Sequence, residues 1–155
     1  MKNFHSITAT VFAKEKENKS EIEKGLKELF PLDLDKEKIK LNTQKATGFE
    51  DKKIEIISIK IEKQKHIQTF FDNLFEKLTE GQIRQIIDEL ETRIDEDGFF
   101  YLRFDKDSWI NDKTLFITDE GNCYHLKFKI AAYPCNKERA IKIMKEFLLN
   151  NSEIS

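Results

Sequence analysis

Long apolar stretches are missing from this sequence, and no uninterrupted run of apolar residues exceeds four. Because a helix that crosses a bilayer needs about 20 apolar residues, the sequence predicts no membrane-spanning segment. The opening residues, Met1 to Ser6, also lack the apolar core of a secretory signal. We therefore expect a soluble, intracellular protein.

Cysteine, proline and glycine are scarce, with two, two and five residues. Cys123 and Cys135 can form at most one bridge, and we expect two reduced thiols. With His125 they are the only soft ligands near one another in the sequence, whereas a structural zinc usually takes four, so we predict no metal and no cofactor. The shortage of proline and glycine leaves little room for linkers. We expect one domain over residues 1–149 and a frayed tail over residues 150–155.

A large charge of one sign is also lacking. The 27 lysines and arginines nearly balance the 29 aspartates and glutamates, and 39% of the residues are hydrophobic. This combination argues against a disordered polyelectrolyte. It also argues against a domain that binds nucleic acid through a basic surface overall, because such domains are clearly basic. Any contact with RNA therefore has to come from a local patch.

Two apolar periodicities divide the 155 residues, which have the length of one ordinary domain. Alternation predicts strands, and apolar residues at positions i, i+3 and i+4 predict helices. The predicted strands cover residues 4–13, 38–43, 53–61, 99–104, 115–117 and 123–133. The predicted helices run from Ser20 to Pro31, over residues 64–78, from Thr79 to Ile94 and from Asn136 onward.

Short polar signals mark the borders of these elements. Ser20 with Glu23 and Thr79 with Gln82 have the spacing of capping boxes, and Asn136 is a cap for the last helix. Residues 119–122 (DEGN) predict a hairpin turn between the last two strands. Residues 105–113 are expected to form a polar loop around Trp109.

The resulting element order, β-α-β-β-α-α-β-β-β-α, predicts an α+β fold with two layers. Strands joined by hairpins favour an antiparallel sheet, and helices with one apolar stripe each favour packing on a single face of that sheet. The other face is then open to solvent.

Strand alternation predicts which side chains lie on the open face. The inward positions of the first strand include His5 and Ile7, so we expect a partly buried histidine there. Cys123 falls on the outward phase of the last strand. The predicted outward side chains are Ser6, Thr8, Thr10, Ser58, Lys60, Tyr101, Arg103, His125, Lys127 and Lys129, with Phe99 near one end.

This face has two interpretations. Lysine and arginine can bind phosphates and an exposed tyrosine can stack a base, which makes RNA binding a hypothesis. The candidate residues are Lys60, Tyr101, Arg103, His125, Lys127 and Lys129. The alternative is an ordinary solvated sheet face, since lysine is common on the solvent-facing side of exposed strands.

Motifs that would indicate an enzyme are absent. The sequence contains no phosphate-binding loop, dinucleotide fingerprint, nucleophile elbow or H-E-x-x-H zinc motif. Cys123 and His125 lack an evident third orienting group, and the acids from Asp95 to Asp97 are expected to form a turn. We predict that the protein is not an enzyme.

Three segments resemble one archaeal family of RNA-binding proteins, whose members are also described as predicted exosome subunits. They are the His5-Ser6-Ile7 strand, the stretch T-E-x₈-E-L-E-x-R-x-D-E-D-G-x-F-Y-L-R-F-D-K from Thr79 to Lys106, and K-I-A-A-Y-P from Lys129 to Pro134. The resemblance covers about residues 4–149. It implies an α+β fold like that of the large-subunit ribosomal protein that binds 5S ribosomal RNA, an archaeal cytoplasm and a link to RNA.

Two hypotheses follow. The first is a non-enzymatic RNA-binding module, associated with RNA processing by the exosome or with the ribosome. The second is a protein–protein adaptor in such a complex, without direct contact to RNA. Near-neutral charge and thirteen phenylalanines suit both.

Overall fold

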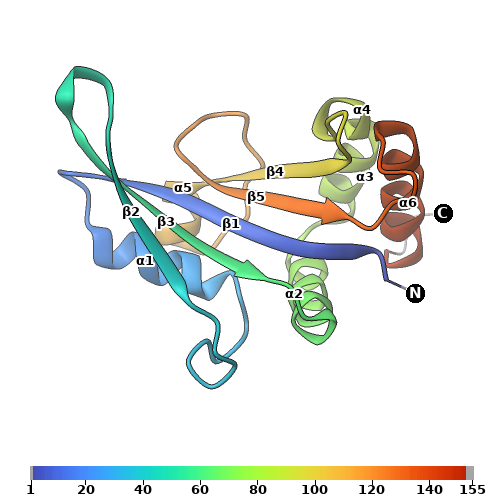
Figure 1. The fold of residues 1–155 in the computed structure, drawn as a ribbon, viewed down its shortest axis with the longest axis horizontal. Helices are drawn as coiled ribbons and strands as arrows, with labels where there is room; N and C mark the ends of the chain where they lie inside the picture. The colour runs from blue at the N-terminus through green and yellow to red at the C-terminus, as the bar shows by residue number, and fades with distance from the viewer. Residues whose placement is uncertain (1, 153–155) are drawn as a thin grey trace. The chain divides into compact units, whose positions relative to one another are not determined.

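The computed structural model describes residues 2–152, apart from the side chain of Phe49. Among these residues it contains five strands, six α-helices and one 3₁₀ turn (Figure 1). In chain order they are β1 (Phe4–Lys14), α1 (Lys19–Glu28), β2 (Leu41–Thr47), η1 (Phe49–Asp51), β3 (Lys53–Ile61), α2 (Gln64–Lys77), α3 (Glu80–Asp88), α4 (Leu90–Arg93), β4 (Phe99–Asp105), α5 (Lys106–Asp112), β5 (Cys123–Ile130) and α6 (Lys137–Asn150).

The strands form one antiparallel sheet in the order β2-β3-β1-β5-β4, which confirms the predicted α+β class. β2 and β3 form a hairpin in which Leu41 lies opposite Ile59 and Thr47 lies opposite Lys53. By contacts the chain divides into two compact units. Of the described residues, the first unit contains those up to Ile7, Glu62–Leu102 and those from Lys127 on; the second contains Thr8–Ile61 and Arg103–Leu126.

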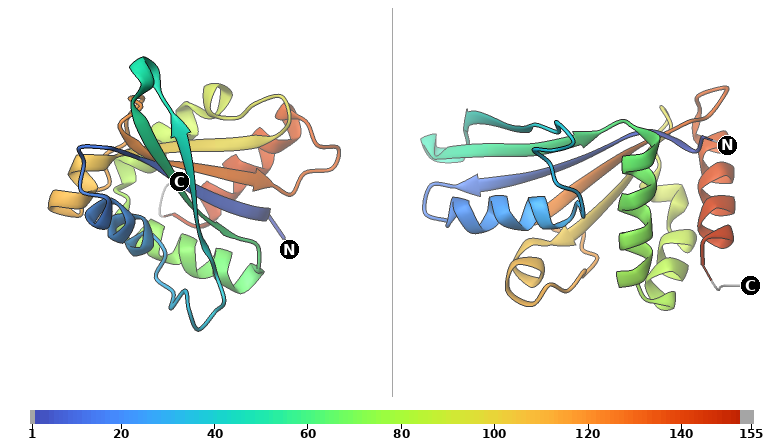
Figure 2. Two further views of the ribbon diagram at one scale, coloured as in Figure 1. Left: turned by 60° about the vertical axis from the view of Figure 1, so that its left-hand side comes forward. Right: turned by 90° about the horizontal axis from the view of Figure 1, so that it is seen from below.

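The core of the first unit is an aromatic cluster. The Phe4 ring centroid lies 4.7 Å from that of Phe71 and 5.0 Å from that of Phe147, and Phe128 lies 5.5 Å from Phe71. Burying one such ring contributes about 2–3 kcal/mol to stability. α3 packs against α4 and α6 in this unit, and Figure 2 shows these helices side by side. The helical stripe predicted over residues 64–78 faces the core, as expected, because Ile67, Phe70, Phe71, Leu74 and Leu78 are buried.

The core of the second unit joins α1 to β3 and α5. Two aromatic side chains donate hydrogen bonds to backbone carbonyl groups of α1. Trp109 Nε1 donates to the Gly25 carbonyl at 2.8 Å, and the Tyr124 hydroxyl donates to the Ile22 carbonyl at 2.8 Å. A Cβ atom at position 25 would collide with the Tyr124 hydroxyl, so only glycine fits there.

The polar loop predicted around Trp109 is wrong, because residues 106–112 form helix α5. Asp105 caps this helix by accepting from the Ser108 backbone N–H at 3.0 Å. Trp109 and Lys106 are both buried in it, each 2% exposed. The polar composition of this segment predicted a loop, but burial of Trp109 and the cap at Asp105 stabilise a helix there.

The hairpin predicted at residues 119–122 is also wrong. The segment before it pairs with the end of β4: the Asp105 N–H donates to the Phe116 carbonyl at 2.8 Å, and the Thr118 N–H donates to the Arg103 carbonyl at 2.9 Å. β5 lies between β1 and β4 and ends at Ile130, three residues before the predicted end. Turn residues alone did not specify which strand the segment pairs with.

Two borders differ from their predictions. Asn18, not Ser20, caps α1, and its side chain accepts from the Glu21 N–H at 3.2 Å. β2 begins at Leu41 rather than at residue 38, where Lys38 has a positive φ of 58°. The capping box at Thr79 and Gln82 is confirmed, as is the cap at Asn136.

The alternation of β1 changes phase between Ser6 and Ile7, which are both buried. His5 is consequently exposed and Ser6 buried, the reverse of the prediction. Cys123, which was predicted to face outward, is also buried. One change of phase within a strand moves every residue on one side of it to the opposite face, and a regular period cannot anticipate it.

The C-terminal tail predicted over residues 150–155 begins inside α6, because Asn150 is the last residue of that helix. The Asn151 side chain donates to the Phe147 carbonyl at 2.8 Å, and residues 153–155 lie outside the described part of the chain. Within residues 2–152, no helix combines the length and the apolar character that a bilayer crossing requires.

Candidate nucleic-acid interface

Three of the six candidate residues, Tyr101, Lys127 and Lys129, lie on the outward side of the first unit together with Phe99. Tyr101 and Phe99 come from β4, and Lys127 and Lys129 come from β5, where they alternate with the buried Phe100, Leu102, Phe128 and Ile130. We call Phe99, Tyr101, Lys127 and Lys129 the β4–β5 face. Lys127 Nζ lies 4.2 Å from the Phe99 ring centroid, a cation–π contact that contributes about 0.5–1 kcal/mol at an exposed site.

Tyr101 is held in place by an acid. Its hydroxyl donates to Asp95 Oδ2 at 2.9 Å, while Asp95 Oδ1 accepts from the Phe99 and Asp97 N–H groups at 2.9 and 3.0 Å. Burial, followed by the bond to Asp95, raises the pKa of Tyr101 to about 12, so the phenol stays neutral. The ring therefore has a fixed orientation beside a carboxylate.

The same hydrogen bonds set the ionisation of Asp95. Burial opposes the charged form, but the Phe99 N–H, the Tyr101 hydroxyl and the Asp97 N–H outweigh it, and Lys127 adds a favourable charge. Together they hold the pKa of Asp95 below its ordinary value. The β4–β5 face thus carries two lysines with a carboxylate at its border, which limits its positive potential.

The other three predicted residues belong to the second unit. Lys60 on β3 and Arg103 on β4 are exposed, and His125 on β5 is half-buried. Arg103 Nη1 donates to the Asp119 carbonyl at 3.0 Å, so one of its five donor positions is used within the fold. Lys60 and Arg103 face solvent as predicted, and the role of all three residues in binding stays a prediction.

A basic groove in the first unit was missed from the sequence. It is a cavity of about 670 Å³ between the N-terminal residues, the segment after β5 and helix α6. The Ala131 N–H donates to the Asn3 carbonyl at 2.8 Å, so the segment after β5 is bonded to the N-terminal residues. We call this cavity the α6 groove; its charged and aromatic lining residues are Lys2, Tyr133, Arg139, Lys142, Glu146 and Phe147. The sequence feature that could have indicated this groove is the pair of cations Arg139 and Lys142, three residues apart on the last helix.

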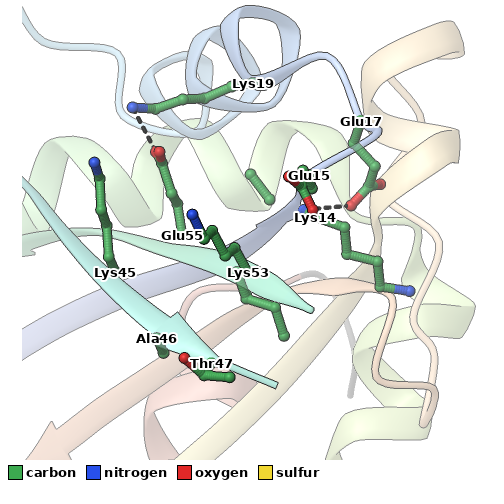
Figure 3. Close-up of a pocket in the computed structure, with 11 residues that line it drawn as sticks. Lys14, Glu15, Glu17, Lys19, Lys45, Ala46, Thr47, Lys53 and Glu55 are labelled. Carbon is green, nitrogen blue, oxygen red and sulfur yellow. Dashed lines mark hydrogen bonds and ion pairs between the residues drawn. The ribbon is translucent and has the colours of Figure 1, made fainter. Parts of the chain in front are cut away.

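A second basic cavity, of about 450 Å³, lies in the second unit beside β2 and β3 (Figure 3). We call it the β2–β3 pocket. Lys14, Lys19, Lys45 and Lys53 line it together with Glu15, Glu17 and Glu55. Lys19 forms an ion pair with Glu55, and Glu17 accepts from the Lys14 backbone N–H at 2.9 Å. Charges of both signs therefore line this pocket.

The cysteines lie in different surroundings. Cys123 is buried, and burial raises the pKa of its thiol. Cys135 is exposed, and its Sγ donates to the Asp97 carbonyl at 2.9 Å. Over the described residues, no three histidine, cysteine, aspartate or glutamate side chains gather as a metal site would require.

Comparison with known proteins places this chain among archaeal relatives. A family model described as RNA binding matches residues 6–148. An RNA-binding protein of Pyrococcus abyssi is 24% identical over 145 residues, which is 93% of each chain.

Solved structures show the same fold. A protein of Archaeoglobus fulgidus superposes with a TM-score of 0.81 at 24% identity, over 92% of this chain and 98% of that one. A protein of Methanothermobacter thermautotrophicus superposes with a TM-score of 0.77 at 23% identity, over 94% and 98%. The likeness to the ribosomal protein that binds 5S RNA stays a prediction.

Proposed function

Since the chain belongs to the family described as RNA binding, we propose that it is a non-enzymatic RNA-binding module. The observation that supports this most is the β4–β5 face. Lys127 and Lys129 project from one strand with no acid between them, beside Phe99 and Tyr101. Lysines of this kind contact phosphates, and aromatic side chains on an open sheet contact bases.

In this proposal Lys60, Arg103 and His125 supply separate contacts on the second unit. Lys60 supplies a point charge, whereas Arg103 keeps donors for a phosphate or a base edge after its bond to Asp119. Because Asp95 borders the β4–β5 face, we expect moderate affinity that comes from several separate contacts.

A fluorescence anisotropy titration tests the proposal. Labelled structured RNA and single-stranded RNA are each titrated at low salt and again at higher salt. We expect binding that weakens steeply with salt, because counterion release accompanies every phosphate contact. No binding of either RNA at tens of micromolar protein would overturn the proposal.

Charge reversal tests the β4–β5 face itself. Lys127→Glu with Lys129→Glu should lower RNA affinity about tenfold or more, since two phosphate contacts become repulsive. Lys16→Glu with Lys24→Glu is the matched control, because both lysines are exposed and lie outside the face and both cavities. Equal affinities of the two double variants would assign binding to another surface.

We further propose that the protein acts in the cytoplasm, in association either with RNA processing by the exosome or with the ribosome. The alternative function is a protein–protein adaptor in such a complex. Phe12 and Phe116 of the second unit favour it, because they are 48% and 58% exposed and a partner protein would cover them. Affinity purification with and without RNase separates the two functions. A partner that survives RNase supports the adaptor.

A further inference from the structure

The α6 groove contains the most exposed large aromatic side chain in the described part of the chain. Tyr133 is 93% exposed and lies three residues after Ile130, the last residue of β5. An aromatic side chain normally gains free energy by burying 150 Å² or more, and Tyr133 gains almost none from the fold. Its ring is therefore available to a ligand.

Positive charge surrounds this ring. Lys2, Arg139 and Lys142 line the groove, and Glu146 is the one carboxylate among the described lining residues. Within residues 2–152, none of the three cations forms an ion pair with a carboxylate. Arg139 and Lys142 come from successive turns of α6, so they present charge along one side of the groove.

Lys2 of the groove and Lys129 of the β4–β5 face both act on the charge of His5. After burial, the charges of Lys2 and Lys129 are the next causes that lower the pKa of His5. Both ammonium groups therefore lie near one imidazole, Lys2 in the groove and Lys129 on the outward side of β5.

Three asparagines also line the groove. Asn150 and Asn151 come from the end of α6, and Asn3 comes from the N-terminal segment. Amides both donate and accept, which is the chemistry that contacts the edge of an unpaired base. Ile143 and Phe147, which are both half-buried, add apolar lining to the groove.

We propose that the α6 groove binds a short single-stranded segment of RNA, with one base stacked on Tyr133 and its phosphates on Lys2, Arg139 and Lys142. The size of the cavity suits this occupant, since sites for small ligands measure about 300–1,000 Å³. A duplex does not suit it, because paired bases are stacked on one another and their faces are not available to a tyrosine. The inference rests on the proposed function and refines it by naming the strand type and the residues.

Anisotropy with a labelled 12-nucleotide single strand and a duplex of the same sequence tests this. Tyr133→Ala should weaken single-strand binding about fivefold or more, the lower end of what stacking one base contributes. It should leave the salt dependence unchanged, because no phosphate contact is lost. The fold should be intact by circular dichroism, since the ring is exposed.

A charge variant provides a second, independent readout. Lys142→Glu should weaken binding and lower the slope of log affinity against log salt by about 0.7, the value for one phosphate contact to a single strand. Lys145→Glu, the same change on the same helix but outside the groove, should change affinity less than about twofold.

The outcomes separate the two proposals: if the wild type binds neither RNA, the proposed function fails. If it binds the single strand but Tyr133→Ala and Lys142→Glu match Lys145→Glu, only the groove is wrong. A preference of the wild type for the duplex over the single strand would also overturn the proposal for the groove.

Discussion

The α6 groove and the β2–β3 pocket are both basic cavities, yet they differ in what their charges do. Among the described lining residues, the groove has three cations, one carboxylate and an exposed tyrosine. The pocket has four lysines, but three glutamates lie among them and none of its described lining residues is aromatic. In the pocket, Lys19 is paired with Glu55, and Glu17 is bound to the Lys14 backbone and to Lys106.

Glu17 illustrates this use of charge within the fold. Burial disfavours its charged form, but the Lys14 N–H and the Lys106 ammonium outweigh burial and lower its pKa. Such a carboxylate is committed to its neighbours, and it cancels part of the positive potential that a phosphate would meet. The two cavities therefore differ in the number of carboxylates among their cations, which is three in the pocket and one in the groove over the described lining residues.

The largest effect is expected from Lys106, which is buried beside the pocket. Its Nζ donates to the Phe12 carbonyl at 2.9 Å and to Glu17 Oε1 at 3.1 Å. Lys106→Met should lower the free energy of unfolding by about 3 kcal/mol, because it leaves a carbonyl and a carboxylate without their cation. Chemical denaturation measures this loss.

Lys113→Met is the control for Lys106→Met. Lys113 Nζ lies 3.1 Å from Glu28 Oε2, but its side chain is 45% exposed. The control should cost less than about 1 kcal/mol, as for other exposed ion pairs. Equal losses in the two variants would contradict a structural role for the buried lysine.

Exchanging charge in the two cavities compares them directly. Arg139→Glu with Lys142→Glu in the groove should cost about 2 kcal/mol of RNA binding free energy, roughly thirtyfold in affinity. Lys45→Glu with Lys53→Glu in the pocket carries the same change in charge and should cost less than about 0.5 kcal/mol. Titration of one labelled single strand at fixed salt measures both. A larger loss for the pocket variant would reverse the comparison.

The smallest effect is expected at Tyr101, whose hydroxyl binds Asp95. Tyr101→Phe should lower the free energy of unfolding by about 1 kcal/mol at pH 7, the usual net contribution of one hydrogen bond. The pKa of Asp95 in the folded protein is depressed, so its contribution is present above the unfolded pKa of about 4 and is lost as pH falls through the folded value. The difference between the variant and the wild type should therefore shrink below pH 4.

Urea denaturation at pH 7 and at successively lower pH follows this difference. Tyr101→Phe keeps the ring, so RNA affinity should stay within about twofold of the wild type. A difference in stability that grows as the pH falls would show that Asp95 is not the relevant partner.

The sequence predicted most of the fold where apolar periods are regular. The strand at residues 53–61 and the helix at 64–78 agree with β3 and α2 within one residue. It failed where one tertiary contact decides the structure. Trp109 turns a polar segment into helix α5, and the pairing of Phe116 with Asp105 replaces the expected hairpin.

The candidate site was predicted in part for the same reason. Alternation placed Tyr101, Lys127 and Lys129 on the outward side of the sheet, because period two is a local property. The α6 groove combines the start of the chain with residues from 131 onward, and no local pattern shows that Lys2 lies near Arg139. Likewise, the bond between Tyr101 and Asp95 depends on the geometry of the turn between them.

The burial of Trp109 gives the protein a built-in optical probe. It is the sole tryptophan of the sequence, and its indole N–H is bonded to the Gly25 carbonyl inside the second unit. Its emission therefore reports on the solvent exposure of that unit, while far-ultraviolet circular dichroism reports on the helices of both. Coincident denaturation curves from the two signals would indicate one cooperative transition over residues 1–149, and separated curves would show that the two units melt independently.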